Sequence, residues 1–487
     1  MNIFLVFQRM VKIGIIGNDL GAYASAAFLR RSLPKSEIIV FSQGLVETPS
    51  FSSPWIRNDR KGRLCVMKLA REILEMGERE FTASKINNSI GMISKGGTSI
   101  EKIPSFSSVV RNLHAICLEP VRGRKKIFSS DISVTDFLAN RFGSSFASNF
   151  SDMICKSITG QTGETVSVHA LFPRMANNVV IHRSVLLGPL WESLSGQSKP
   201  KGYYTNVMDH LWQNLMSGGK YITMLPRFDL SIFFERLEQH TKSSCRIVPS
   251  QVTSISHKSV QCHNGESHEI DLVVSSVRPD DLFRICNGES SMKNSVLKLS
   301  SFKNMLRNRY SFECKSFDPS LTSRVMIDKD SGNMIIVQSG LYDGASRDVL
   351  VVDILSDHQL DENAFSQYPI LSGFASNTLI GFQSDIEEIP SCTLGSNQAL
   401  FELNQWRKKF IQSEKMDLQF VGKWFYAPTG SVTDIVADAD RLVSLISTRY
   451  ARYPKIENEL TSDFISRSDR SLDMKYVSES WDSRSLL

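Results

Sequence analysis

The stretch GKWFYAPTGSVTD, residues 422–434, is a glycine-bounded loop that leads into a helix predicted over 434–449. It becomes informative beside residues 11–29, where an isoleucine-rich run, a tight turn and an alanine-rich segment predict strand, turn and helix. A second apolar run over 37–41 completes a βαβ unit of the length typical of a dinucleotide-binding fold. The two ends of the chain together predict a nucleotide site that is closed from both sides.

The bulk composition is that of a globular protein with room for two or three domains. The 487 residues are 41% hydrophobic and 22% charged, with a net charge of +5. This mild charge permits attraction to an acidic ligand or a membrane surface, and the chain carries no nucleic-acid-binding motif, so we expect no nucleic-acid partner. No apolar run reaches the roughly 18 residues of a membrane span, so any membrane contact is expected to be peripheral.

The cysteines and histidines give no metal or disulfide signature. The eight cysteines are scattered without a CxxC pair, which predicts reduced thiols. The histidines in the middle of the chain lack the spacing of zinc ligands, so we expect them to be structural or solvated and predict no metal site. These histidines are His210, His240, His257, His263 and His268.

The turn after the first strand reads Gly17-Asn18-Asp19-Leu20-Gly21-Ala22. A dinucleotide fingerprint needs three small residues here, and Gly17 and Ala22 satisfy the first and third positions. Asp19 occupies the second, which puts a carboxylate where pyrophosphate would lie. Ser42 stands where an acidic residue would hold a ribose hydroxyl. The motif alone therefore leaves an ordinary βαβ turn open, although helix N-terminal amides can still receive phosphate.

Further motifs, in matching order over most of residues 12–450, resemble the protoporphyrinogen oxidase family of the FAD-dependent amine-oxidase superfamily. The segments that carry this resemblance are DISVTDFLANRFG at 131–143, DMICK at 152–156, LFP at 171–173, HRSVLLG at 182–188, GG at 218–219, MLP at 224–226, DLVVSSVRP at 271–279, IPSCTLG at 389–395 and VTD at 432–434.

The resemblance implies FAD as cofactor, with the pyrophosphate above Gly17 and Ala22 and the adenine against the backbone of Val252. Trp55-Ile56-Arg57 matches the family's G-G-W-I-R, although Ser53-Pro54 replaces its two glycines. The family segment that follows is missing, and the loop 422–431 is two residues longer than the family pattern. The implied cofactor-binding residues are Gly17, Asn18, Asp19, Leu20, Gly21, Ala22, Ser42, Trp55, Arg57, Val252, Lys423, Gly430, Ser431 and Val432.

For the substrate, Lys156 matches a family arginine and is a candidate partner for a propionate, or else a solvated surface lysine. Phe302, Phe312 and Phe317 either wall a macrocycle or belong to the core. The family's reaction is hydride transfer to flavin, so the protein mostly positions and desolvates the substrate. We therefore assign no catalytic side chain.

The resulting fold class is α/β (α+β), with three domains and a disordered tail at 455–487. Residues 10–63, 213–276 and 389–452 form a discontinuous FAD-binding Rossmann-like domain. Residues 64–212 form a helical membrane-lying domain, and residues 277–388 form a mixed-sheet substrate domain, mainly antiparallel strands.

The function implied by the resemblance is oxidation of protoporphyrinogen IX to protoporphyrin IX in haem biosynthesis, with FAD reoxidised by O₂. The implied location is the intermembrane-space face of the mitochondrial inner membrane, with ferrochelatase as a partner and a homodimer as the assembly. Two alternatives stay open: a catalytically impaired relative that binds porphyrin or a haem-pathway partner, and another FAD oxidase of the superfamily.

Overall fold

The computed structural model describes residues 10–42, 66, 68–76, 81–85, 91–94, 101–102, 113–119, 131–172, 175–176, 179, 184–185, 222–226, 230–288, 290–313, 324–342, 348–368, 379–426 and 432–452.

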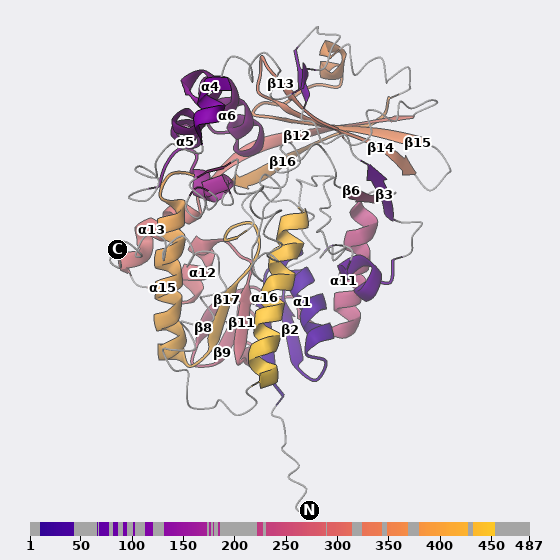
Figure 1. Ribbon diagram of the computed structural model, residues 1–487. Helices are drawn as coiled ribbons and strands as arrows, with labels where there is room; N and C mark the ends of the chain where they lie inside the picture. Colours follow the sequence, from indigo (N-terminus) through magenta and orange to yellow (C-terminus); the bar gives the residue numbers. More distant parts are fainter. Residues whose placement is uncertain are drawn as a thin grey trace, which may run out of the picture.

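A five-stranded parallel sheet forms the lower half of the molecule (Figure 1). Its order is β17-β11-β1-β2-β7. The central strand β1 therefore pairs on one side with β2, the next strand in the chain, and on the other side with β11 from a distant part of the chain. The central strands are almost wholly apolar, as expected for a parallel sheet that is covered on both faces. The strands are β1 (Lys12–Ile16), β2 (Glu37–Phe41), β7 (Arg246–Val248), β11 (Leu272–Ser275) and β17 (Asp417–Phe420).

One face of this sheet is covered by α1 (Leu20–Ser32), α11 (Leu230–Ser244) and α16 (Val432–Arg452). The alanines of α1 let it lie close to the sheet, with Ala22, Ala24, Ala26 and Ala27 all buried. Helix α16 packs on α1 through a stripe with helical spacing, as the sequence predicts. The stripe consists of Val432, Ile435, Val436, Ala439, Leu442, Val443 and Ile446.

The other face is covered by α12 (Pro279–Ile285), α13 (Lys293–Leu299) and α15 (Ser396–Glu414). A small antiparallel sheet, β8 (Val252–Ser256), β9 (Ser259–Cys262) and β10 (Ser267–Glu269), shares this core. Alternate residues of one strand thus reach different cores: Ile15 packs against α1 and α16, and Ile16 packs on the α12–α15 side.

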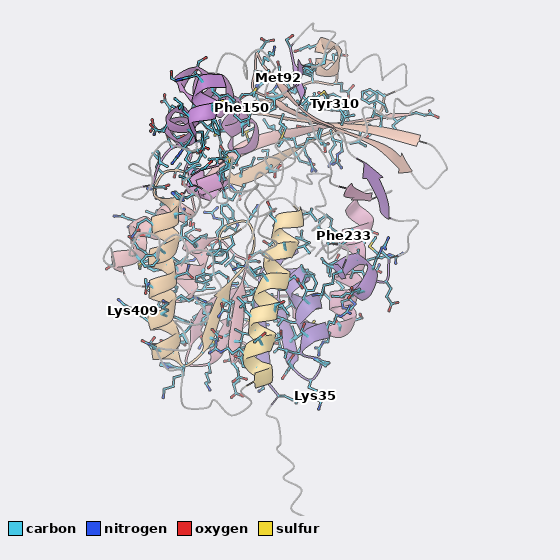
Figure 2. All side chains as sticks on the ribbon, in the orientation of Figure 1. Lys35, Met92, Phe150, Phe233, Tyr310 and Lys409 are labelled. Carbon is cyan, nitrogen blue, oxygen red and sulfur yellow. The ribbon has the colours of Figure 1, made fainter. Side chains whose placement is uncertain are left out.

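A seven-stranded mixed sheet, ordered β16-β12-β15-β14-β13-β4-β5, forms the upper half (Figure 1). Its pairs are antiparallel except β13 with β4. Tyr310 is fully buried within it (labelled in Figure 2) and donates to the carbonyl of Asp361 at 2.7 Å. The strands are β4 (Gly91–Ile93), β5 (Glu101–Lys102), β12 (Phe302–Glu313), β13 (Arg324–Asp328), β14 (Met334–Tyr342), β15 (Asp348–Ser356) and β16 (Leu379–Pro390).

Short helices lie on this upper sheet: α4 (Leu113–Leu118), α5 (Val134–Phe142), α6 (Ser144–Thr159) and α7 (Val168–Leu171). Phe150 (Figure 2) and its neighbours share one apolar core with β12, β13 and β14. Helix α6 ends at Gly160, where an added Cβ would lie 2.6 Å from Met305 Sδ, so this glycine permits the close approach of α6 to β12.

The predicted α/β fold is confirmed, and the region expected to be helical over 64–212 also contributes strands. β4 and β5 join the upper sheet, and β3 (Phe81–Lys85) pairs with β6 (Ile222–Pro226). Residues 68–73 form a π-helical turn, η1, that packs on α1. Most of residues 182–212 in the predicted helical domain, and the whole predicted tail over 455–487, lie outside the described residues.

Helices α12 and α13 fall within the predicted substrate domain of 277–388 but pack on the core of the parallel sheet. Among the helices of the described residues, none is both long and apolar enough to cross a bilayer.

Candidate nucleotide site

The carboxyl ends of the parallel strands meet along one edge, where nucleotides bind in open α/β sheets. The first residues after the strands continue the hydrogen-bond ladder there. The Gly17 amide donates to the Phe41 carbonyl at 3.2 Å, and the Ser276 amide donates to the Ile16 carbonyl at 3.0 Å. At the sheet's edge strand, the Val421 amide donates to the Ser275 carbonyl at 3.0 Å. These bonds bring residues from three distant parts of the chain together.

We call Gly17, Asp19, Gly21, Ser276 and Gly422 the cradle. Two of its glycines leave little room for a side chain: an added Cβ on Gly17 would lie 2.0 Å from Ser276 Oγ, and one on Gly21 would lie 3.3 Å from Gly422 Cα. Gly17 and Gly422 have φ of +140° and +94°, a region that side chains rarely adopt. The cradle thus has the close backbone approach of a dinucleotide-binding turn.

Asp19 caps α1 within this cradle. Its Oδ1 accepts the Ala22 amide at 3.0 Å, the hydrogen bond of an N-cap residue. Its Oδ2 faces the loop after β17, because an added Cβ on Gly422 would lie 3.4 Å from that oxygen. The carboxylate therefore lies between the N-terminus of α1 and Gly422.

Ser42, at the end of β2, is buried with 3% exposure. Its Oγ lies 3.3 Å from the hydroxyl of Tyr23 on α1, and its amide donates to the Val248 carbonyl at 3.1 Å. The side chain expected to meet a ribose hydroxyl is thus engaged with an aromatic residue of α1.

Asp438 on α16 holds the loop after β17 in place. This fully buried carboxylate accepts the Gly422 amide at 3.0 Å and pairs with Arg441 at 2.6 Å. Burial raises the pKa of the Asp438 carboxyl, and the Arg441 guanidinium and the Gly422 amide oppose that rise. Arg441 also lies 5.1 Å from the ring centroid of Tyr426, so α16 contacts this loop twice.

Cations and aromatic rings gather beside the cradle. The guanidinium of Arg278 lies 5.2 Å from the Phe302 ring and 5.7 Å from the Trp424 ring, and it pairs with Asp280 through two bonds of 2.7 and 3.1 Å. The pKa of Arg278 is raised, first by its bond to Asp280. Lys423 Nζ lies 5.2 Å from the Trp424 ring. Two basic side chains therefore lie within about 6 Å of the Trp424 ring centroid.

The other predicted cofactor residues fall into three groups. Asn18, Leu20 and Ala22 belong to the turn and first residues of α1, where Leu20 and Ala22 are buried. Val252 starts β8 and is buried in the core beneath α12 and α15, and Val432 starts α16 and is buried against α1. Trp55, Arg57, Gly430 and Ser431 lie outside the described residues.

Lys156 lies on α6 in the upper half, not beside the cradle (Figure 1). Its side chain is 47% exposed, its Nζ is 3.5 Å from Asp152, and its stem packs 3.6 Å from the Cβ position of Gly332. Of the candidate pocket phenylalanines, Phe302 contacts Trp424 edge-on with centroids 6.1 Å apart, and Phe312 is buried in the upper sheet. Phe317 lies outside the described residues.

The backbone of the cradle fits the pyrophosphate of FAD, whereas the Asp19 side chain does not. Pyrophosphate is held by helix N-terminal amides and attracted by the positive end of the helix dipole. In α1 the Ala22 amide is already bonded to Asp19, whose negative charge would oppose a second anion. Among the described residues there is no group of three His, Cys, Asp or Glu side chains that could hold a metal ion.

Four residues of the site were not predicted individually: Ser276, Gly422, Asp438 and Arg278. Ser276 directly follows the apolar strand β11, which is the signal that would have found it, and Gly422 follows β17 after one residue. Asp438 interrupts the apolar face of α16, and a carboxylate on a buried face indicates a buried partner.

No protein-family model and no curated protein sequence matches the chain. Solved structures do match over nearly the whole length. A reduced UDP-galactopyranose mutase matches with a TM-score of 0.60 at 11% identity, covering 95% of this chain and 97% of its own. A provisionally assigned protoporphyrinogen oxidase from Exiguobacterium sp. 255-15 has a TM-score of 0.55 at 12% identity, covering 90% and 99%. Cyclohexylamine oxidase from Brevibacterium oxydans IH-35A has a TM-score of 0.55 at 13% identity, covering 91% and 100%.

These neighbours include a mutase and two oxidases, so the shared fold does not by itself select a reaction. The chain therefore has the same overall fold as these structures, with a Rossmann-like parallel sheet and a second, mixed sheet.

Proposed function

We propose that the chain is an FAD-dependent oxidoreductase that oxidises protoporphyrinogen IX to protoporphyrin IX. The observation that supports FAD as the cofactor is the cradle, in which Gly17, Gly21 and Gly422 lie close together at the N-terminus of α1. Both chain ends contribute to it, as the loop over 422–434 and the first βαβ unit predict. The family motifs over residues 131–279 support the substrate.

Lys156 supports a substrate with carboxylate groups. Its side chain is 47% exposed and lies near Gly332, in the turn between β13 and β14, so its ammonium is accessible to a ligand. Its neighbour Asp152 lies 3.5 Å away, and such an exposed pair contributes at most about 1 kcal/mol. A propionate can therefore replace Asp152 at small cost.

The test starts with the absorption spectrum of the purified full-length protein, before and after FAD is added and unbound FAD removed. Retained flavin bands support the cofactor. The same protein is then assayed for porphyrin fluorescence with protoporphyrinogen IX. Retained flavin with no porphyrin formed contradicts the proposed substrate and favours another oxidase of the superfamily.

The Lys156 proposal is tested with Lys156→Ala, assayed on protoporphyrinogen IX and on its dimethyl ester. Loss of the ammonium is expected to raise KM about tenfold or more for the diacid, as expected for loss of a charged hydrogen bond, and to leave the ester unchanged. The control is Lys409→Ala, an exposed lysine of α15 that Figure 2 places far from α6. Equal effects on both substrates contradict a propionate contact.

A second candidate function is a catalytically impaired relative that binds porphyrin or a haem-pathway partner. The Asp19 carboxylate at the N-terminus of α1 favours it, because that charge opposes pyrophosphate. A colourless protein that retains no added FAD but quenches porphyrin fluorescence selects this candidate.

Location and assembly are proposed from the family resemblance: the intermembrane-space face of the mitochondrial inner membrane, a homodimer, and ferrochelatase as a partner. The net charge of +5 is compatible with an anionic bilayer surface. Sedimentation with phosphatidylserine vesicles and with phosphatidylcholine vesicles tests the membrane contact. If the protein is absent from the pellets of both kinds of vesicle, the proposed membrane contact is contradicted.

A further inference from the structure

The cradle holds a carboxylate of its own chain at the position of a cofactor phosphate. Asp19 Oδ1 accepts the Ala22 amide at 3.0 Å, and Oδ2 faces Gly422. The carboxylate thus makes the contact with the helix terminus that a phosphate oxygen makes in a dinucleotide site. Its two sides touch α1 and the loop after β17, the two parts of the chain that close the site.

The loop that faces Asp19 is held by Asp438, a buried carboxylate of the neighbouring helix α16 that pairs with Arg441 at 2.6 Å. A pyrophosphate entering beside Asp19 would bring its negative charge next to the Asp19 carboxylate.

The residue at the ribose end of the site also departs from the dinucleotide-binding pattern. Ser42 is neutral and buried, and its hydroxyl lies 3.3 Å from that of Tyr23. The neutral serine does not offer the charged acceptor that usually binds a ribose hydroxyl in this fold.

We propose that Asp19 is an internal occupant of the pyrophosphate position, which lowers the affinity of the wild-type chain for FAD and other adenine dinucleotides. The proposal rests on the proposed function, because it concerns regulation of the same cofactor site. FAD occupancy then depends on displacement of Asp19 from the N-terminus of α1. Asp19→Gly restores the small second residue of the fingerprint and removes the charge.

The experiment measures dissociation constants for FAD and for ADP by equilibrium dialysis of the full-length wild type, Asp19→Gly and Asp19→Asn. Asp19→Gly is expected to bind both ligands at least tenfold more tightly than wild type. Asp19→Asn is expected to lie between them, because the amide oxygen can keep the Ala22 bond while the charge is lost. ADP is included because it probes the phosphate position without the flavin.

The control for the lost helix cap is Ser133→Gly, which removes the hydroxyl that accepts the Asp136 amide at 3.0 Å at the start of α5. It is expected to leave both dissociation constants within twofold of wild type. Thermal melts of all variants report whether each is folded, since a lost cap lowers stability and does not abolish folding.

The outcomes separate this proposal from the proposed function. Tight FAD binding that is equal in wild type and Asp19→Gly overturns the role of Asp19 and leaves FAD as cofactor. Tighter ADP binding by Asp19→Gly with no FAD binding by any variant supports the role of Asp19 and overturns the FAD enzyme. Failure of both ligands to bind any folded variant overturns both.

Discussion

The carboxylate of Asp438 accepts the backbone N–H of Gly422 at 3.0 Å and so joins the middle of α16 to the end of β17. The bond is buried, and the other carboxylate oxygen of Asp438 pairs with Arg441 at 2.6 Å. One side chain therefore fixes the loop that faces Asp19 across the cradle.

Asp438→Ala is expected to destabilise the protein by about 3–5 kcal/mol, because it leaves a buried amide and the Arg441 guanidinium without their acceptor. Urea unfolding measures this change. The control Asp281→Asn disrupts an exposed pair with Arg284 and is expected to cost under about 1 kcal/mol. A loss from Asp438→Ala no larger than that from the control would falsify the structural role.

Gly422→Ala is expected to be more destabilising than Gly265→Ala. Both glycines have positive φ, +94° and +84°, so each substitution carries a backbone cost of about 1–2 kcal/mol. An added methyl group on Gly422 would lie against the Asp19 carboxylate, 3.4 Å from Oδ2, and would displace water from it, whereas one on Gly265 meets no atom within 4 Å. Thermal melts of the two variants measure the difference, and equal shifts contradict a close contact between Gly422 and the Asp19 carboxylate.

Arg278→Gln is expected to cost about 1–3 kcal/mol, because it removes a cation from two aromatic rings and two charged hydrogen bonds to Asp280. Arg284→Gln, which loses a more exposed pair with Asp281 on the same helix, is the matched control. Chemical denaturation of both variants checks the difference. Similar costs would show that the ring contacts contribute little.

His169 is expected to make stability fall in acid. It is 4% exposed, neither ring nitrogen has a hydrogen-bond partner among the described residues, and burial lowers its pKa below 6.5, opposed by the Asp131 carboxylate. The unfolded chain therefore binds more protons than the folded chain just below pH 6.5. Stability decreases as the pH falls there, by up to about 1.4 kcal/mol per pH unit from this group.

Denaturant unfolding of wild type and His169→Phe between pH 5 and 8 tests this slope. The unfolding free energy of His169→Phe minus that of the wild type is expected to be constant above pH 7. Below pH 6.5 this difference is expected to increase as the pH falls, because only the wild type loses stability from His169. His257→Gln, at an 85% exposed histidine, is the control for loss of a histidine. Parallel curves for wild type and His169→Phe contradict the prediction.

Local periodicity was enough to predict the first βαβ unit and the last helix of the parallel half of the fold. The isoleucine-rich β1, the alanine-rich α1 and the apolar stripe of α16 are continuous signals, and each element formed within a few residues of its expected range. Helix α15 was missed, although its buried residues Leu403, Trp406 and Phe410 recur at the spacing of three to four residues typical of an amphipathic helix. The lengths of β12 and β16 were missed because cross-strand contacts, including the Arg307–Asp385 pair, stabilise their polar residues.

The sequence by itself determined that a βαβ unit begins the chain, that Asp19 replaces a glycine at its turn, and that a glycine-bounded loop precedes the last helix. These are local properties of strand, turn and helix signals. Only the tertiary structure decided that Gly422 lies against Gly21 and Asp19, and that Asp438 holds it there. The physical reason is that strand order in a parallel sheet depends on burial of both faces, which no local segment encodes.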